Sequence, residues 1–297
     1  MGSEAAVAVR RAPFAMRRRG VVLLAIALAA GIAFLALDAP LAGLVPQRGG
    51  LAIVRGFFAR MLRPALTYET AVPPGTPPLL LEALGGLRRT LVFAVAAMSL
   101  AVPAGFVLGF LGSMAWWSGD LAGGGSSVSR ALRRSVAPAV WGATRALIVG
   151  MRSIHELLWA VIFLAAFGLS TTSAVLAIAI PYAGTLAKVF SEMMDEAPRD
   201  AALALRGAGA GPAQVFCFGL LPRALPDMGA YAFYRFECSV RSSAVLGFFG
   251  FPTLGYSISA AFENLHYGEV WTYLYALGAL VVGIEIWSSA LRRRFVA

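Results

Sequence analysis

Charged residues are scarce in this sequence. They make up 13% of its 297 residues, whereas a soluble domain carries roughly 25%. So few charges, separated by long uncharged stretches, cannot cover a surface that faces water. Hydrophobic residues make up 59% of the chain instead. The composition therefore excludes an ordinary soluble domain and predicts a protein that lies in the lipid bilayer.

Cysteine and histidine are also rare, with two of each. Cys217 and Cys238 show neither metal-ligand spacing nor a disulfide framework, so we expect two buried free thiols. His155 and His266 stand in separate segments, so they do not form the polar cluster that a membrane enzyme needs. The sequence has no Gly-x-x-x-x-Gly-Lys-Ser/Thr loop to hold ATP phosphates. We therefore expect no cofactor, no metal site and no enzymatic activity in this chain.

The net charge of the chain is +10, which in a soluble protein would suggest nucleic acid as a partner. Here the arginines stand at the ends of apolar runs, where basic residues orient a membrane protein. Nucleic acid is therefore not an expected partner.

Six apolar runs are expected to span the membrane. The first, Gly20 to Leu37, could be a cleaved signal peptide or a retained span. Its length and the lack of a clear cleavage site favour a retained span. The uncharged run from Leu157 to Ala187 is too long for one straight helix across a core of about 30 Å, so we place a tight hairpin at residues 168–173. The five later spans are expected over about 90–112, 146–168, 174–191, 227–249 and 270–290.

The segments between the spans have distinct compositions. Leu51 to Leu62 is expected to form a short helix on the membrane surface, and residues 72–78 a rigid, proline-rich linker. Residues 120–129 are rich in glycine and serine and predict a flexible loop. We therefore divide the chain into residues 1–83, an N-terminal span with an outer linker, and a main membrane domain over residues 84–290.

The distribution of basic residues predicts which segments face the cytoplasm. Six spans put both termini on one side, and with the termini inside, most Lys and Arg outside the spans fall in cytoplasmic segments, as the positive-inside rule requires. We expect a multi-pass protein of the plasma (inner) membrane with both termini in the cytoplasm. The loop 192–226 then also faces the cytoplasm.

The loop 192–226 is longer than a simple connection needs to be. Residues 200–206 predict a short helix and residues 207–211 a glycine break. Pro212 is expected to begin a second short helix, since proline suits the first helical position, and Pro222 and Pro226 are expected to stop it. Such a helical knuckle can fit a groove on a cytoplasmic partner and pass on a rigid-body push.

The same loop resembles the EAA loop of ABC import permeases, which has a Glu-Ala-Ala-like start, a later glycine and a final Leu-Pro. The glycine corresponds to Gly209, and Leu203 stands where the family has glutamate. The resemblance implies contact with an ATPase through residues of this loop. These coupling residues are Asp200, Leu203, Ala204, Arg206, Gly209, Gln214 and Pro222.

Two further blocks are similar to the phosphonate-uptake group of these permeases. Residues 234–247 look like its Tyr-x-Phe-Glu-x-Asn-Val-Arg-Ser-Ala-x-Val-Leu-Gly block. Residues 152–160 look like its Arg-x-Ile-Pro-Glu-Leu-x-Trp-Ala block, with His155 in place of proline. The group continues with Gly-Ala-Gly-Gly-Ile-Gly, where residues 250–255 of this chain are Gly-Phe-Pro-Thr-Leu-Gly. The resemblance covers about residues 84–290.

This resemblance implies the all-α fold of the type I ABC importer permeases and transport of a phosphonate or related small oxyanion. It implies three kinds of partner: a second permease copy in a homodimer or pseudo-dimer, a dimer of cytoplasmic ATP-binding subunits, and a periplasmic or lipid-anchored substrate-binding protein. The alternatives are a permease for another small anionic solute and a secondary transporter. A secondary transporter would show inverted repeats, and the sequence contains no second copy of the loop.

Ionisable residues within spans cost about 2.5–3.5 kcal/mol each on insertion scales, so each needs a reason. Glu237 and Arg241 are four residues apart, a favourable spacing for an ion pair on one helix. Either Arg241 lines the path and binds a phosphonate-like oxyanion through its guanidinium, or it only neutralises Glu237 or Glu156. The candidate path residues are Glu156, Glu237, Ser239, Arg241, Ser242 and Ser243.

Overall fold

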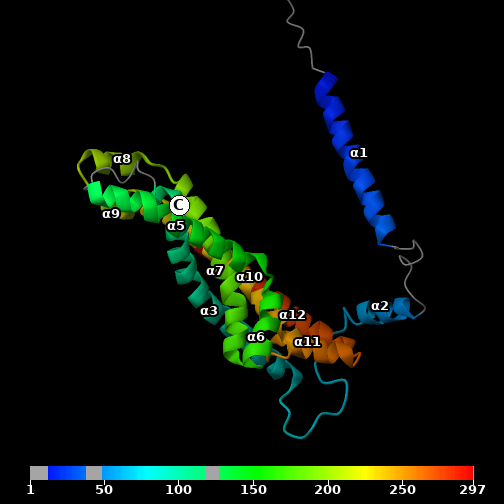
Figure 1. Cartoon of the computed structure of the whole chain (residues 1–297). Coiled ribbons are helices and arrows are strands. Elements are labelled where there is room, and N and C mark those ends of the chain that lie inside the picture. The colour runs from blue at the N-terminus through cyan, green and yellow to red at the C-terminus, as the bar shows by residue number, and fades with distance from the viewer. Residues whose placement is uncertain (1–12, 38–48, 118–126, 297) are drawn as a thin grey trace, which may run out of the picture. The chain divides into compact units, whose positions relative to one another are not determined.

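The computed structural model describes residues 13–37, 49–117 and 127–296, and these residues form helices and no strand (Figure 1). The chain divides into two units, residues 1–58 and 59–297. The first contains α1 (Pro13–Ala36) and most of α2 (Gly50–Ala59). These helices fall on the first predicted span and on the predicted surface helix. Residues 120–126 of the predicted glycine- and serine-rich loop lie outside the described residues, and its last three residues, 127–129, belong to the next helix.

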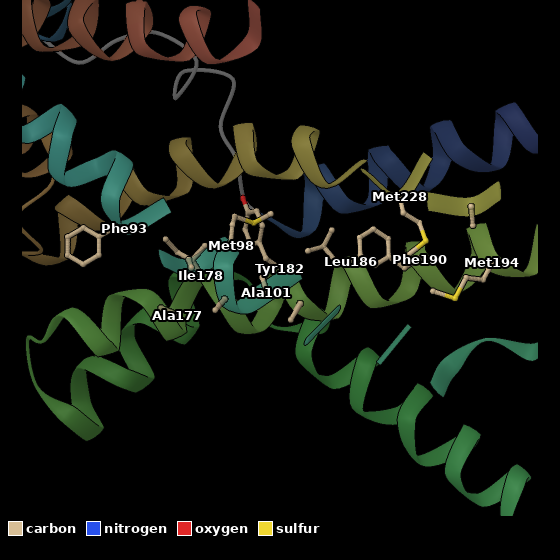
Figure 2. Packing of buried hydrophobic residues seen from close by; sticks show 14 of the residues in the cluster. Phe93, Met98, Ala101, Ala177, Ile178, Tyr182, Leu186, Phe190, Met194 and Met228 are labelled. Carbon is tan, nitrogen blue, oxygen red and sulfur yellow. The ribbon is translucent and has the colours of Figure 1, made fainter. Parts of the chain in front are cut away.

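The second unit is a bundle built around α3 (Leu79–Gly112), α7 (Thr171–Glu196), α10 (Leu221–Val245) and α12 (Tyr267–Val296). Its core runs along α7 between α3 and α10, and Figure 2 shows the apolar side chains that fill it. Small residues such as Ala101 and Ala177 let the helices approach closely, and larger ones such as Leu186 and Phe190 fill the remaining space. Helices α3 and α7 extend beyond the predicted spans, α3 by residues 79–89 and α7 by residues 171–173 and 192–196.

The predicted span over residues 146–168 is not a single helix. The chain instead forms α5 (Ser127–Ser153) and α6 (Glu156–Phe167), which meet at an angle of 89°. His155 begins the second helix, because its Nδ1 accepts a hydrogen bond from the Leu157 N–H at 3.3 Å. An N-cap of this kind satisfies an N–H that has no partner inside the helix. The bend therefore places Glu156 in the first turn of a new helix.

A second bend follows α10. A 3₁₀ turn, η3 (Leu246–Phe249), leads into α11 (Leu254–Glu263), and the two halves of this pair differ in direction by 46°. Among the described helices, α3, α7 and α12 are long and apolar enough to cross a membrane, and the number rises to five if each bent pair counts as one span. The predicted hairpin at residues 168–173 is present, with Ser170 accepting from the Ser173 N–H at 3.2 Å at the start of α7.

Residues 59–78 of the second unit run over the beginning of α12. The Ala65 N–H donates to the Gly268 carbonyl at 3.0 Å, and the Glu69 N–H donates to Glu269 Oε1 at 2.8 Å. Burial, followed by the negative charges of Glu82 and Glu269, raises the pKa of the nearby Tyr68 hydroxyl above its ordinary value. This stretch is therefore a fixed part of the bundle.

Candidate coupling loop and translocation path

The loop 192–226 folds into a compact helical knuckle, which lies with α8 (Asp200–Gly207) and α9 (Pro212–Gln214) at one end of the bundle, opposite α6 and α11 (Figure 1). The glycine break is confirmed, since Gly209 has φ +87°. That left-handed conformation suits glycine and is unfavourable for residues with a Cβ. Gly209 therefore sets the angle between the two short helices.

The predicted stop at Pro222 and Pro226 is wrong. From α9 the chain continues through a π-helical turn, η2 (Val215–Leu220), directly into α10. Pro222 lies in the first turn of α10, where the missing proline N–H costs least. Pro226 lies inside the helix without ending it. The knuckle is consequently continuous with α10.

Two contacts hold the knuckle rigid. A Cβ added to Gly219 would lie 2.8 Å from Ala202 Cα, so the two arms touch backbone to backbone at this point. Phe216 packs its ring against Phe110 and Trp116, with centroids 5.0 Å and 5.5 Å away. These aromatic rings belong to the end of α3 and to α4 (Met114–Trp117). The knuckle is therefore attached to two neighbouring helices as well as to α10.

A polar cluster braces the same end of the bundle. Asp195 Oδ1, near the end of α7, accepts hydrogen bonds from Ser113 Oγ at 2.6 Å and from the Ala115 N–H at 2.8 Å. Its Oδ2 lies 3.8 Å from an Arg145 guanidinium nitrogen. One carboxylate thus joins α4 and α5 to the ends of α3 and α7.

Replacing Asp195 with alanine is expected to lower the free energy of unfolding by about 1–3 kcal/mol. Ser113 Oγ loses its acceptor, and the Ala115 N–H keeps only its longer bond to Ser113 Oγ, at 3.2 Å. The loss is measured as a fall in the thermal unfolding midpoint of the detergent-solubilised protein. Glu196→Ala is the matched control, since that neighbour is exposed and a surface change stays within about 0.5 kcal/mol. An equal fall in both variants would contradict the bracing role.

Most of the predicted coupling residues lie on the outside of the knuckle. Leu203 is 55% exposed, and Arg206 is half-buried. Gln214 has a structural bond as well, since its Oε1 accepts from the Gly211 N–H at 2.9 Å. The remaining exposed members of the predicted set are Asp200, Ala204, Gly209 and Pro222.

Sequence reasoning missed Phe218, which is 73% exposed on the knuckle. An aromatic residue in a segment otherwise rich in glycine and alanine was the available signal for it. The expected burial of Cys217 is wrong, because it is exposed beside Phe218, whereas Cys238 is half-buried. The outside of the knuckle thus carries two exposed apolar side chains, Leu203 and Phe218.

A stripe of exposed side chains runs along α10, while its other faces pack against α3, α7 and α12. The spacing of these residues, four and seven apart, keeps them on one helical face. We call them the α10 stripe: Arg223, Asp227, Tyr234, Arg241 and Val245. At the knuckle end the stripe borders a cavity of about 620 Å³, whose lining includes Glu196, Arg223, Asp227, Tyr231 and Tyr234. Charged and hydroxyl-bearing groups thus follow the whole length of a helix in the predicted fifth span.

The predicted pair of Glu237 and Arg241 is confirmed, with a guanidinium nitrogen 3.6 Å from Glu237 Oε1. The two partners differ in access, since the Glu237 side chain is 11% exposed and that of Arg241 is 54% exposed. The pair therefore leaves more than half of the Arg241 side chain open on the stripe.

The predicted path residues divide into two groups. Ser239 and Ser243 are fully buried, and their hydroxyls donate to the Phe236 and Thr90 carbonyls at 2.6 Å and 2.8 Å. Their hydroxyls face the inside of the bundle, and Ser243 bonds to the backbone of α3.

Ser242 and Glu156 are brought together, although they lie far apart in the sequence. Ser242 Oγ donates to Glu156 Oε1 at 2.8 Å. The Tyr182 hydroxyl lies 2.9 Å from the same Ser242 Oγ, and the Arg235 guanidinium stacks 4.6 Å from the Tyr182 ring centroid. This chain of hydrogen bonds joins α6, α7 and α10 beside the stripe.

The described residues hold no group of three or more His, Cys, Asp or Glu side chains that could bind a metal ion. The α10 stripe presents guanidinium, hydroxyl and carboxylate groups as hydrogen-bond donors and acceptors.

Comparison with known proteins gives three kinds of match. Residues 79–297 match the profile of the family described as "Binding-protein-dependent transport system inner membrane component". The phosphite transport system permease protein PtxC of Stutzerimonas stutzeri is 35% identical over 161 residues, which cover 53% of this chain and 58% of that protein. The phosphate-import permease protein PhnE of Mycolicibacterium smegmatis is 31% identical, over 52% of this chain and 29% of that protein. The chain thus aligns with less than two thirds of these relatives.

Solved structures share the fold. An amino acid ABC transporter is 17% identical with a TM-score of 0.58, covering 72% of this chain and 94% of that chain. A chain of the MetNI methionine ABC transporter, in an inward-facing conformation, is 21% identical with a TM-score of 0.58, covering 74% and 99%. The predicted all-α fold of the type I importer permeases is confirmed.

Proposed function

Since this chain belongs to the family of binding-protein-dependent transport system inner membrane components, we propose that it is the permease subunit of an ABC importer for a phosphonate, a phosphite or a related small oxyanion. The match over residues 79–297 carries this proposal. The substrate class is supported by the curated relatives, which are named as phosphite and phosphate permeases. A separate subunit hydrolyses the ATP.

The α10 stripe is proposed to line the translocation path. A charged side chain facing lipid costs about 2.5–3.5 kcal/mol on insertion scales, and Arg241 is more than half exposed on this face. A stripe that also carries Arg223 and Asp227 is stable when it faces water or another polypeptide. A second copy of the permease, in a homodimer, is proposed to cover the stripe and enclose the path between the two copies.

The knuckle is proposed to lie in the cytoplasm and to dock on one ATP-binding subunit of a dimer. Exposed Leu203 and Phe218 supply apolar contact area there, and continuity with α10 gives the docked motor a direct mechanical connection to the stripe. Both termini are proposed to lie in the cytoplasm. A periplasmic or lipid-anchored binding protein delivers substrate on the opposite side.

Affinity purification of this chain from its native membrane is expected to recover an ATP-hydrolysing subunit. Vesicles that contain the purified complex and its binding protein are expected to take up phosphite only when ATP is present on the side of the membrane that the ATPase subunits face. Uptake driven by an ion gradient without ATP would instead identify a secondary transporter. ATP-driven uptake of another small anion, without phosphite uptake, would keep the importer and overturn the substrate class.

A further inference from the structure

We propose that Glu156 accepts a hydrogen bond from the acidic P–OH group of the substrate, so that the path prefers the singly protonated oxyanion over the fully ionised one. The inference rests on the proposed function, because it assigns a role within the same path. It explains why a negatively charged carboxylate lies next to a path that is proposed to carry anions.

The position of Glu156 is fixed by its neighbours. The 89° bend before α6 places it in that helix's first turn, and Ser242 Oγ donates to its Oε1 at 2.8 Å. Because a serine hydroxyl carries one proton, the Tyr182 hydroxyl, 2.9 Å from Ser242 Oγ, must be the donor in the next link. One carboxylate oxygen is therefore occupied and the side chain is held by two other helices.

The other carboxylate oxygen has accepting capacity left. Glu156 Oε2 lies 3.7 Å from His155 Nε2, which is longer than a hydrogen bond. The Glu156 side chain is 23% exposed, so a small solute can reach it. An ionised carboxylate only accepts hydrogen bonds, and the partner that fits Oε2 is therefore a donor.

Arg241 supplies the opposite character at the same depth. Ser242, which holds Glu156, directly follows Arg241 on α10. A helix rises only about 1.5 Å and turns about 100° per residue, so the two residues lie at one level of α10 on adjacent faces. A singly protonated phosphonate has charged oxygens for the guanidinium and one P–OH for the carboxylate. A fully ionised oxyanion such as sulfate offers acceptors alone and is repelled by Glu156. A site discriminates strongly between similar ligands when the wrong ligand leaves the polar groups of the site unpaired.

Other ionisable groups lie on the elements around Glu156, and their titration must be distinguished from that of the substrate. His155 precedes Glu156, Tyr182 comes from α7, and α10 contributes Arg235, Glu237, Cys238 and Arg241. Histidine ordinarily titrates near pH 6.5, close to the second ionisation of a phosphate monoester near 6. His155 is therefore the group most able to imitate the expected pH dependence.

The test measures ATP-driven uptake of phosphite by vesicles that contain the whole importer, at pH values from about 6 to 8. The wild-type rate is expected to fall by about tenfold or more across this range, because each pH unit above the ionisation of the substrate removes about nine tenths of the protonated form. Glu156→Gln keeps the shape of the side chain and adds an amide donor for the ionised substrate. Its rate is expected to change less than about twofold over the same range.

Three controls test whether the pH dependence of uptake comes from the substrate. The affinity of the binding protein is measured separately at each pH, and saturating binding protein is used throughout. His155→Asn keeps a capping side chain without a titrating group, and it is expected to retain the wild-type pH profile. A second transported phosphonate with a weaker second acid group is expected to shift the midpoint of the wild-type profile upward.

The outcomes distinguish the inference from the proposed function. If the double variant Arg241→Ala with Glu237→Gln stops uptake while Glu156→Gln keeps the wild-type pH profile, the path stands and the role of Glu156 is overturned. A flat profile in His155→Asn, or a midpoint that does not move with the substrate, also overturns it, since a protein group is then titrating. Normal uptake by Arg241→Ala would instead remove the stripe from the path.

Discussion

Replacing Gly209 with valine is expected to reduce substrate uptake at least about tenfold while the protein remains folded in the membrane. The φ of +87° at Gly209 is unfavourable for any residue with a Cβ and most of all for a β-branched one. Strain of this kind costs about 1–3 kcal/mol, which the knuckle relieves by changing the angle between its arms. The docking surface on the knuckle then no longer fits its partner.

Gly207→Val is the matched control for this prediction. Gly207 is also exposed and, like Gly209, has no atom within 4 Å of an added Cβ, but it ends α8 with an ordinary φ. Uptake and substrate-stimulated ATP hydrolysis are measured for both variants in vesicles. The expected result is that Gly209→Val hydrolyses ATP without moving substrate, and Gly207→Val behaves like the wild type. Equal loss in both variants would mean that side-chain bulk, not backbone angle, is responsible.

The sequence predicted the knuckle well because its structure is local. Gly209 and Pro212 act on their own backbone, so a helix, a break and a new helix follow from the residues alone. The end of the second helix was mispredicted at Pro222 and Pro226. The π-helical turn before Pro222 joins the knuckle to α10, and nothing in the pattern of apolar residues marks such a turn.

The sequence could not predict the bend at His155 for a similar reason. Apolar residues continue on both sides of it, so hydropathy gives a single span, whereas the bend depends on one side-chain cap. The candidate path residues show the same limit. Ser239, Ser242 and Ser243 are the same residue type, but they point in different directions, because successive helix positions differ by about 100°. Which of them meets Glu156 depends on how α6 and α3 pack against α10, and that is tertiary information.

Replacing Arg241 with alanine is expected to lower phosphite uptake by about 10- to 100-fold at every pH. Arg241 is the arginine of the α10 stripe within the predicted span, and its side chain is 54% exposed. Charge-assisted hydrogen bonds from a guanidinium to an oxyanion contribute roughly 1.5–3 kcal/mol. Uptake is measured at saturating binding protein and ATP, with the amount of assembled complex determined by co-purification of the ATP-binding subunit. The expected result is little uptake for each complex that assembles.

The variant Arg241→Ala alone leaves the carboxylate of Glu237, 11% exposed, without its partner, and an unpaired buried charge destabilises a protein strongly. Adding Glu237→Gln removes that charge while keeping the size of the side chain. If Arg241 contacts the substrate, the double variant assembles fully and still fails to transport. If Arg241 serves only to neutralise Glu237, the double variant regains wild-type uptake, and the stripe then owes its polarity to helix packing. The two roles make opposite predictions for one measurement, because substrate binding needs the guanidinium itself whereas neutralisation needs only that no net charge remains.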